Sequence, residues 1–339
     1  MSTPAGTAAR APRRGRSIVR LTESPILRRI GEAVLTLVGV AIVVFVMLRA
    51  IPGDQISANL GTEAAALSGE QRRSLEAYYG LDRPLVLQFF TWIGGVLTGN
   101  LGYSAQAQES VLSLTARSLP ITIELAILAI VLGTVIGVPL GMLSASRPNG
   151  IRDGIAQGVG LAGLSIPAFL LGAALLAAAA RILRWNPNGA GFVTLVENPG
   201  LNLQQMALPA LVLGFGIAAP IARTARTALL EVRSQDFVRT AIGKGVPPRR
   251  VQAVHVLRNS LVPIVTMTGL QFGYLLGGAV VVEQIFSIPG IGRQVLTGIG
   301  QKEYAVVQSS VLVIALLFVL VNLGTDLLYR VIDPRVRAS

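Results

Sequence analysis

Long apolar stretches recur along the chain and are separated by shorter polar segments. Each stretch is long enough to cross a hydrocarbon core of roughly 30 Å as an α-helix. The pattern therefore predicts an all-α membrane protein with six transmembrane helices. The predicted spans cover approximately residues 30–51, 119–143, 155–183, 205–230, 261–283 and 305–329.

The first span follows a basic segment, an order that is also found in secretory signal peptides. The apolar run from Ile30 to Ile51 is too long for the core of a signal peptide, and no clear small-x-small cleavage site follows it. We therefore expect a retained span. Residues 1–27 are rich in Ala, Pro, Gly, Ser, Thr and Arg and contain no apolar run, so we predict a disordered basic N-terminus.

The composition agrees with a polytopic membrane protein. Of the 339 residues, 52% are hydrophobic and 14% are charged, whereas soluble domains carry about a quarter charged residues. The net charge of +12 does not indicate a nucleic-acid partner, because the arginines gather in loops on one side of the predicted membrane. The positive-inside rule places both termini and the 233–262 loop in the cytoplasm. The basic clusters are 1–29, 144–153, 223–258 and 330–339.

The segment 52–118 lies between the first two spans and is predicted to be an external helical subdomain. It contains more acidic than basic residues. A Ser-x-x-Gln capping box predicts the start of one helix, a glycine closes that helix, and a proline opens a second, apolar helix. The expected boundaries are Ser68–Gln71, Tyr79–Gly80, Pro84 and Gly99.

The loop between the fourth and fifth spans, Asp236–Pro263, is polar and rich in arginine. Its glycines and the Pro247–Pro248 pair interrupt two short amphipathic patterns, which predicts helix, tight turn and helix, with the second helix starting near Pro248. We expect so structured a loop to dock another molecule. The apolar positions are Phe237, Ala241 and Ile242 in the first helix and Val251, Val254, Val256 and Leu257 in the second, with Arg249, Arg250 and Arg258 on other faces.

No catalytic or metal-binding motif accompanies this pattern. The chain has no cysteine and a single histidine, His255, which excludes disulfides and thiolate metal sites. It contains no Walker-type loop, no His-Glu-x-x-His and no Gly-x-Ser-x-Gly motif. We therefore expect a chain that is not an enzyme and that holds no cofactor or metal of its own.

The fifth predicted span combines neutral polar groups with several glycines. Thr266, Thr268, Gln271 and Tyr274 could line a pathway that lets varied solutes pass, and no full charge occurs before Glu283. Hydrogen bonding between helices is the alternative role for the same groups. The nearly uncharged span centres disfavour a proton-coupled secondary carrier, which usually places paired charges at mid-membrane.

Two other spans contain features that predict packing or bending. Glu124 lies near one end of the second span, where a carboxylate is costly unless paired, and we expect a structural partner such as Arg117 or a helix terminus. Pro167 is expected to bend the third span. A four-residue glycine repeat favours close helix packing, at Gly133, Gly137 and Gly141.

The polar loop resembles the EAA loop of the permease subunits of ABC importers. The similarity rests on Thr240–Ala241, Gly245 and Leu261–Pro263, and the run from Phe237 to Pro263 is similar to the peptide and nickel branch of that family. Only Trp185–Gly189 departs from the run expected at its position. Further motifs similar to this branch are Arg49–Asp54, Tyr79–Pro84, Gly99–Gly102, Arg117–Glu124, Gly163–Phe169, Glu283–Gly292 and Tyr329–Arg335.

The resemblance implies a type I ABC importer permease fold over residues 28–335. The 233–262 loop would couple to a cytoplasmic ATPase, a role that falls on Phe237, Arg239, Thr240, Ala241, Gly245, Arg249, Arg250, His255, Arg258 and Asn259. The translocation path would include Thr266, Thr268, Gln271, Tyr274 and Glu283. An external gate or binding-protein contact would include Asp54, Tyr103, Glu124 and Phe286.

The resemblance also implies partners for an import function. These are a second homologous permease, with a heterodimer favoured, one or two ATPase subunits that hold ATP and magnesium, an extracytoplasmic substrate-binding protein, and membrane lipid. The chain would form half of a path for di- and oligopeptides in the bacterial cytoplasmic membrane. Nickel chelates or other small solutes are alternative cargoes, and a basic loop held by anionic lipid is the alternative to ATPase coupling.

Overall fold

A computed structural model describes residues 25–50, 56, 67–78, 80–187, 189 and 191–332. The predictions for residues 1–24 and for Asp54 fall outside the described residues. Helix α2 begins at Pro25, where proline suits the first turn because its missing N–H would have no partner there. The last residues of the segment predicted to be disordered, 1–27, are therefore helical.

Among the described residues, five helices are long and apolar enough to cross a membrane. The sixth span is a broken pair of helices, α7 and α8, whose axes meet at 98°. The six-span all-α class predicted from the pattern is thus confirmed when the broken pair counts as one span. The helices are α2 (Pro25–Ala50), α6 (Val111–Ser146), α7 (Ile151–Ser165), α8 (Ala168–Ile182), α9 (Pro199–Arg233), α12 (Arg258–Ile285) and α14 (Tyr304–Ile332).

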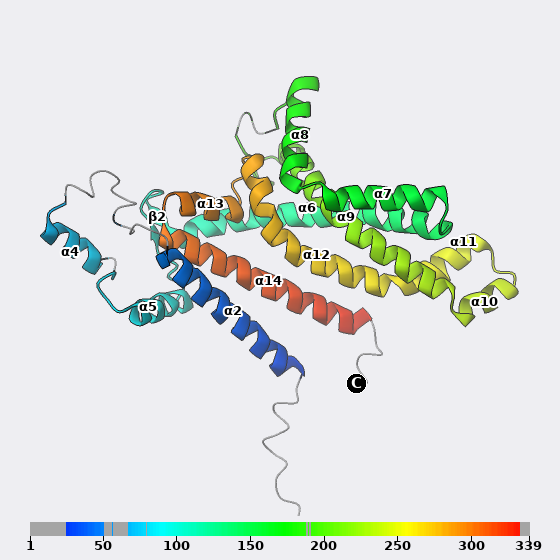
Figure 1. Ribbon diagram of the computed structural model, residues 1–339, viewed down its shortest axis with the longest axis horizontal. Coiled ribbons are helices and arrows are strands. Elements are labelled where there is room, and N and C mark those ends of the chain that lie inside the picture. Colours follow the sequence, from blue (N-terminus) through cyan, green and yellow to red (C-terminus); the bar gives the residue numbers. More distant parts are fainter. Residues whose placement is uncertain are drawn as a thin grey trace, which may run out of the picture.

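The break between α7 and α8 is much sharper than the bend expected at Pro167. Ile166 adopts an extended conformation with φ −85° and ψ 116°, and α8 starts directly after Pro167. Proline disfavours helical geometry in the residue before it, so the chain leaves the helix at Ile166. As a result α8 points away from the long helices (Figure 1).

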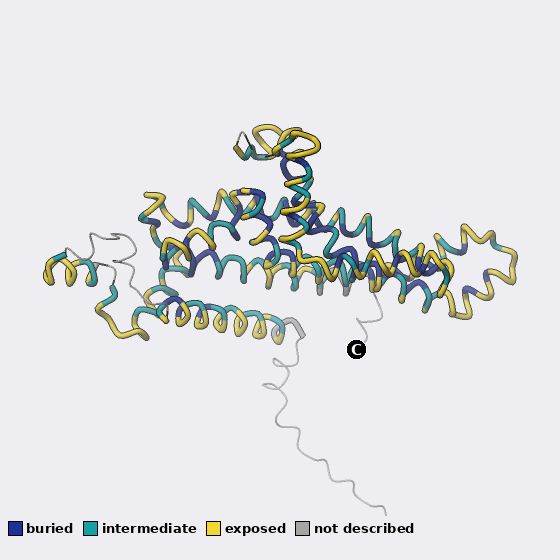
Figure 2. Tube along the Cα trace, turned by 45° about the horizontal axis from the view of Figure 1, so that its top comes forward, coloured by how far each residue is buried: buried dark blue, intermediate teal, exposed yellow. Residues whose placement is uncertain are grey.

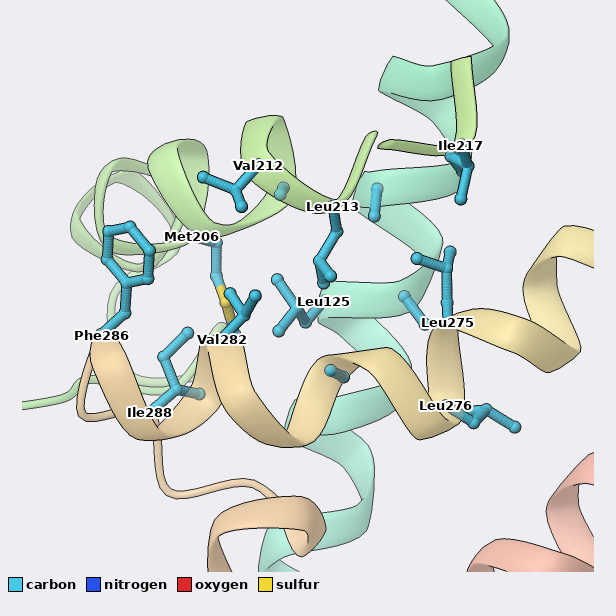
Figure 3. Packing of buried hydrophobic residues seen from close by; sticks show 14 of the residues in the cluster. Leu125, Met206, Val212, Leu213, Ile217, Leu275, Leu276, Val282, Phe286 and Ile288 are labelled. Carbon is cyan, nitrogen blue, oxygen red and sulfur yellow. The ribbon is translucent and has the colours of Figure 1, made fainter. Parts of the chain in front are cut away.

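Helices α6 and α9 form the centre of the bundle and approach each other closely. A Cβ atom at Gly137 would lie 2.6 Å from the carbonyl oxygen of Ala218, and one at Gly141 would lie 2.6 Å from that of Ala222. The predicted glycine repeat is therefore a packing feature. The apolar core continues from this pair onto α12 (Figure 3) and includes Leu125, Met206, Leu213, Ile217, Leu275 and Val282.

The short elements gather at the two ends of the bundle (Figure 1). We call these the α13 end and the α10 end. The α13 end holds α4 (Gly69–Tyr78), α5 (Leu85–Leu97), the two-stranded antiparallel hairpin of β1 (Tyr103–Ser104) and β2 (Glu109–Ser110), and α13 (Ile291–Gly300). The α10 end holds α10 (Asp236–Gly243), α11 (Pro248–Arg250) and the π-helix η2 (Val251–Leu257).

The predicted capping box at the start of α4 is confirmed. Ser68 Oγ accepts from the backbone N–H of Gln71 at 3.2 Å, and the Ser68 N–H donates to Gln71 Oε1 at 2.9 Å. Gly80, with φ +66°, follows shortly after the end of α4, as expected for a closing glycine. The second predicted helix, α5, starts directly after Pro84.

Candidate functional site

The structured loop at the α10 end joins α9 to α12 as a helical hairpin. Helix α10 forms the first arm, and α11 with η2 forms the second, which runs without interruption into α12. The predicted order of helix, tight turn and helix is confirmed, and the second arm starts at Pro248 as expected. We call the segment Asp236–Leu257 the coupling hairpin.

The tight turn of the coupling hairpin depends on Gly245. The Val246 N–H donates to the Ala241 carbonyl at 3.2 Å and the Gly245 N–H donates to the Ile242 carbonyl at 2.9 Å, a Schellman pattern that requires a left-handed residue after the helix. Gly245 supplies it with φ +75°, and nothing lies within 4 Å of a Cβ atom placed there. Glycine is needed for its backbone angle, because the space around it is open.

The inner face of the coupling hairpin packs on the ends of α6 and α9. Val238 and Ala241 on α10 are buried with Val251 and Val256 of the second arm. Ser260, fully buried at the start of α12, donates to the carbonyl of Ala228 on α9 at 3.2 Å and to that of Val256 at 2.9 Å. These contacts attach the hairpin firmly to α9. The partners from α6 and α9 in this cluster are Ala145 and Leu229.

The outer face of the coupling hairpin leaves apolar side chains uncovered among basic ones. Phe237 is 46% exposed and Ile242 is 59% exposed, although the sequence pattern placed both on the same stripe as Ala241. Val238 is buried on α10 in place of Phe237 and Ile242. Val254 on the second arm is exposed, like those two residues. The turn region at this end is exposed as a whole (Figure 2). The exposed basic residues are Arg239, Lys244, Arg249, Arg250 and Arg258.

The ten residues predicted for coupling all fall on this hairpin or directly after it. Ala241 is buried and belongs to the inner face, and His255 is half-buried. Asn259 donates from Nδ2 to the His255 carbonyl at 2.6 Å, which supports the wide π-helical turns of η2. The remaining residues are exposed and free to meet a partner: Phe237, Arg239, Thr240, Gly245, Arg249, Arg250 and Arg258.

A buried ion pair beside the hairpin is a feature that sequence reasoning missed. Asp153 of α7 is 1% exposed and binds both Arg226 of α9 and the Ser144 hydroxyl of α6. The backbone N–H of Asn149 and the side chain of Gln157 also donate to it, at 2.8 and 2.7 Å. A lone carboxylate next to an apolar run was the available signal, and its charged partner Arg226 is 73 positions away in sequence.

The polar residues of α12 do not form one polar surface. The hydroxyls of Thr266 and Thr268 donate to the carbonyls of Val262 and Ile264 within their own helix, each at 2.9 Å. Tyr274 is 70% exposed, and Gln271 is half-buried. Their role in a translocation path remains a prediction.

Glu283 was predicted to line the translocation path, but its side chain is fully buried within this chain. Its carboxylate accepts from the Thr122 hydroxyl of α6 at 2.6 Å and from the backbone N–H of Arg293 in α13 at 2.9 Å. Thr122 Oγ1 in turn accepts from the Ile291 N–H at 2.9 Å. Glu283 therefore fixes the start of α13 against α6 and α12, where a negative charge suits a helix N-terminus, and exposes no surface to a passing solute.

The residues predicted for an external gate are also scattered. Phe286 is 2% exposed and packs in the core beside Gly172, so it cannot meet a binding protein in this conformation. Tyr103 on β1 is exposed. Of the two partners expected for Glu124, Arg117 is wrong, because Arg117 forms its ion pair with Glu109; Glu124 instead interacts with the side chain of Asn202 on α9.

The comparisons with known proteins agree with this arrangement. Residues 137–338 match the family model described as binding-protein-dependent transport system inner membrane component, and residues 24–126 match the model of the N-terminal part of such components. The dipeptide transport system permease protein DppB of Escherichia coli is 37% identical over 336 residues, covering 92% of this chain and 98% of the relative. The di/tripeptide transport system permease protein DppB of Pseudomonas aeruginosa is 37% identical over 333 residues with the same coverage.

A solved structure supports the fold. An inward-facing form of the MetNI methionine ABC transporter aligns with a TM-score of 0.53 and 20% identity over 65% of this chain and 96% of the compared chain. At this identity the likeness concerns the fold alone, and it agrees with the predicted type I importer permease architecture. The chain therefore belongs to the family of inner membrane components of binding-protein-dependent transport systems, as a DppB-like ABC permease.

Proposed function

We propose that this chain forms half of the translocation path of an ATP-driven importer for di- and oligopeptides. The observation that carries the proposal is the extent of the likeness: relatives named as dipeptide and di/tripeptide permeases match 92% of the chain. The residues that match the family model include the coupling hairpin and several of the helices that could cross a membrane. In this proposal the chain moves solute and leaves ATP hydrolysis to its partners.

The coupling hairpin is the proposed docking surface for a cytoplasmic ATPase subunit. Exposed Phe237 and Ile242 would enter an apolar groove, and the surrounding arginines would meet acidic residues at its rim. Motion of the ATPase would pass into α9, because the inner face of the hairpin is packed on it, and into α12, because the second arm continues directly into that helix. ATP and magnesium would be held entirely by the ATPase subunits.

The proposal includes a second, homologous permease and an extracytoplasmic binding protein. Helix α12 leaves a stripe of side chains uncovered by this chain, with Leu270, Tyr274 and Val281 exposed on it, and a second permease, in a heterodimer, would complete the path there. The α10 end and both termini would face the cytoplasm, as the distribution of basic residues predicts. The α13 end would then receive solute from the binding protein.

The test is transport by the assembly reconstituted in proteoliposomes. The chain would be purified with its co-purifying subunits, and uptake of a labelled dipeptide would be followed with ATP inside the vesicles and binding protein outside. We expect uptake that requires both ATP and binding protein, and that unlabelled di- and tripeptides reduce. Uptake driven by an imposed proton gradient without ATP would overturn the proposal in favour of a secondary carrier.

A further inference from the structure

Two adjoining cavities at the α13 end share a single residue, Arg49 at the end of α2. The first is a groove of about 480 Å³ between α2 and α5, and apart from Arg49 its walls are apolar, with Phe45, Val46 and Phe89 among them. The second cavity, of about 440 Å³, has a mixed lining, in which polar groups of α5, of the loops before α5 and β1 and of the start of α14 lie among apolar ones. An elongated ligand with one apolar part and one polar part would fill both.

The polar cavity presents two cationic side chains and no carboxylate. Two guanidinium groups line it, those of Arg49 and Arg83, and among the described residues neither forms an ion pair. No acidic side chain is among the residues that line this cavity. The electrostatic character of the cavity therefore favours an anion.

Two further donors on the walls of the polar cavity are buried and lack partners among the described residues. They are Trp92 Nε1 on α5 and Gln308 Nε2 on α14. Gln308 is only 4% exposed, and a buried donor without an acceptor costs stability. A ligand with several acceptor oxygens, such as a phosphate group, would satisfy these donors and the guanidinium groups together.

Arg49 is held in place at the junction of the cavities. Its Nε and Nη2 donate to Gln88 Oε1 at 3.1 and 2.9 Å, its Nη1 donates to the Phe45 carbonyl at 3.4 Å, and its guanidinium carbon lies 3.5 Å from the centre of the Phe45 ring. A guanidinium has five N–H groups, so Arg49 can still donate to a ligand. Its neutral partners leave its positive charge uncompensated.

The groove opens on a surface suited to lipid. Along α2 the large hydrophobic residues that are exposed include Leu35, Val43 and Met47, and exposed positions follow this helix for most of its length (Figure 2). Helix α5 contributes exposed Val86 and Phe90 beside Trp92, and has no buried residue. Apolar helices with aromatic residues near the end of a span are typical of the boundary between hydrocarbon and headgroups.

We infer that these cavities bind an anionic glycerophospholipid. An acyl chain lies in the groove between α2 and α5, and the phosphate accepts hydrogen bonds from Arg49, Arg83, Trp92 and Gln308. The lipid thereby adds to the Arg49–Gln88 hydrogen bonds and the Phe45–Phe89 ring contact that already join α5 to α2.

The experiment uses fluorescence of Trp92, one of two tryptophans in the chain. In a Trp185→Phe background, the full-length chain is reconstituted by itself, so that Trp92 is its one tryptophan, in vesicles that contain increasing fractions of brominated phosphatidylglycerol or brominated phosphatidylcholine. We expect half-maximal quenching at an about tenfold lower fraction of phosphatidylglycerol, the preference expected of one charge-assisted hydrogen bond. Equal quenching by the two lipids would overturn the inference.

Variants identify the groups that select the lipid. Arg83→Gln and Gln308→Leu should each reduce the preference for phosphatidylglycerol several-fold, whereas Arg73→Gln should retain it, because Arg73 lies on α4 and lines neither cavity. Arg83 is substituted in preference to Arg49, because Arg49 also donates a hydrogen bond to Gln88 and its loss would disturb the contact between α2 and α5. If both cavity variants retain the full preference, the assignment is wrong.

Competition separates the lipid from simpler anions and from cargo. We expect millimolar inorganic phosphate or glycerol 3-phosphate to leave the lipid preference unchanged, because neither fills the apolar groove. Loss of the preference with phosphate alone would identify a plain anion site. Loss of the preference with a dipeptide would identify a site for cargo, and either result would overturn the lipid assignment.

Discussion

Arg226 of α9 binds Asp153 of α7 through two contacts, Nε to Oδ1 at 3.0 Å and Nη2 to Oδ2 at 2.9 Å. The Ser144 hydroxyl of α6 donates to the same carboxylate, so one group joins three helices near the coupling hairpin. Arg226 lies shortly before Leu229, which packs against the hairpin, and Ala228, whose carbonyl accepts from Ser260 at the start of α12. The first half of the broken span is thus tied to the helix that leads into the proposed ATPase contact.

Replacing Asp153 with Ala should strongly destabilise the chain, because it leaves the Arg226 guanidinium without its carboxylate. We expect a loss of about 3–5 kcal/mol, as for other broken buried pairs, measured as a lower thermal unfolding midpoint of the detergent-purified protein. Glu76→Gln is the control, because it breaks an exposed pair with Arg72 on α4, which should cost at most about 1 kcal/mol. A midpoint for Asp153→Ala equal to that of the control would contradict this reading.

Substitution of Gly245 should affect coupling more than membrane insertion. A side chain at φ +75° costs about 1–2 kcal/mol in backbone strain, which should distort the turn of the coupling hairpin. We expect Gly245→Val to reach the membrane but to hydrolyse ATP without matching peptide uptake in proteoliposomes. Gly243→Val is the control, since Gly243 has open space around it and ends α10 without a positive φ. Normal uptake by Gly245→Val would argue against the role of the turn.

Substitutions at two neighbouring residues of α10 should affect ATPase docking and folding stability separately. Phe237 is exposed and Val238 is buried against the α6 and α9 ends. Phe237→Ala should weaken co-purification of the ATPase without lowering the unfolding midpoint. Val238→Ala should lower the unfolding free energy by about 1–2 kcal/mol through lost methyl burial. If Phe237→Ala retains the ATPase fully, this face does not provide the main contact.

Thr122→Val should loosen the start of α13. The Thr122 hydroxyl bridges the Glu283 carboxylate and the Ile291 N–H, and valine of similar shape removes both bonds. We expect a cost of about 1–3 kcal/mol because buried polar groups lose their partner, together with faster hydrogen exchange at the first amides of α13. Thr266→Val, which removes only a bond within α12, should leave exchange in α13 unchanged. The hypothesis fails if both variants behave alike.

The sequence by itself determined the elements that depend on local pattern. Apolar length predicted the spans, the Ser68–Gln71 capping box predicted the start of α4, and Gly245 with Pro248 predicted the hairpin. The resemblance in the loop and in the ordered motifs also predicted the family. These features were accessible because periodicity, capping and turn chemistry act between residues a few positions apart.

Only the tertiary structure decided which polar groups meet and which apolar ones stay exposed. Asp153 finds Arg226 across 73 positions, and Glu283 finds Thr122 across 161. The helical spacing of α10 did not reveal that Val238 packs inward while Phe237 remains exposed. These outcomes depend on how whole helices approach one another, because burying a charge requires a partner that packing alone can supply.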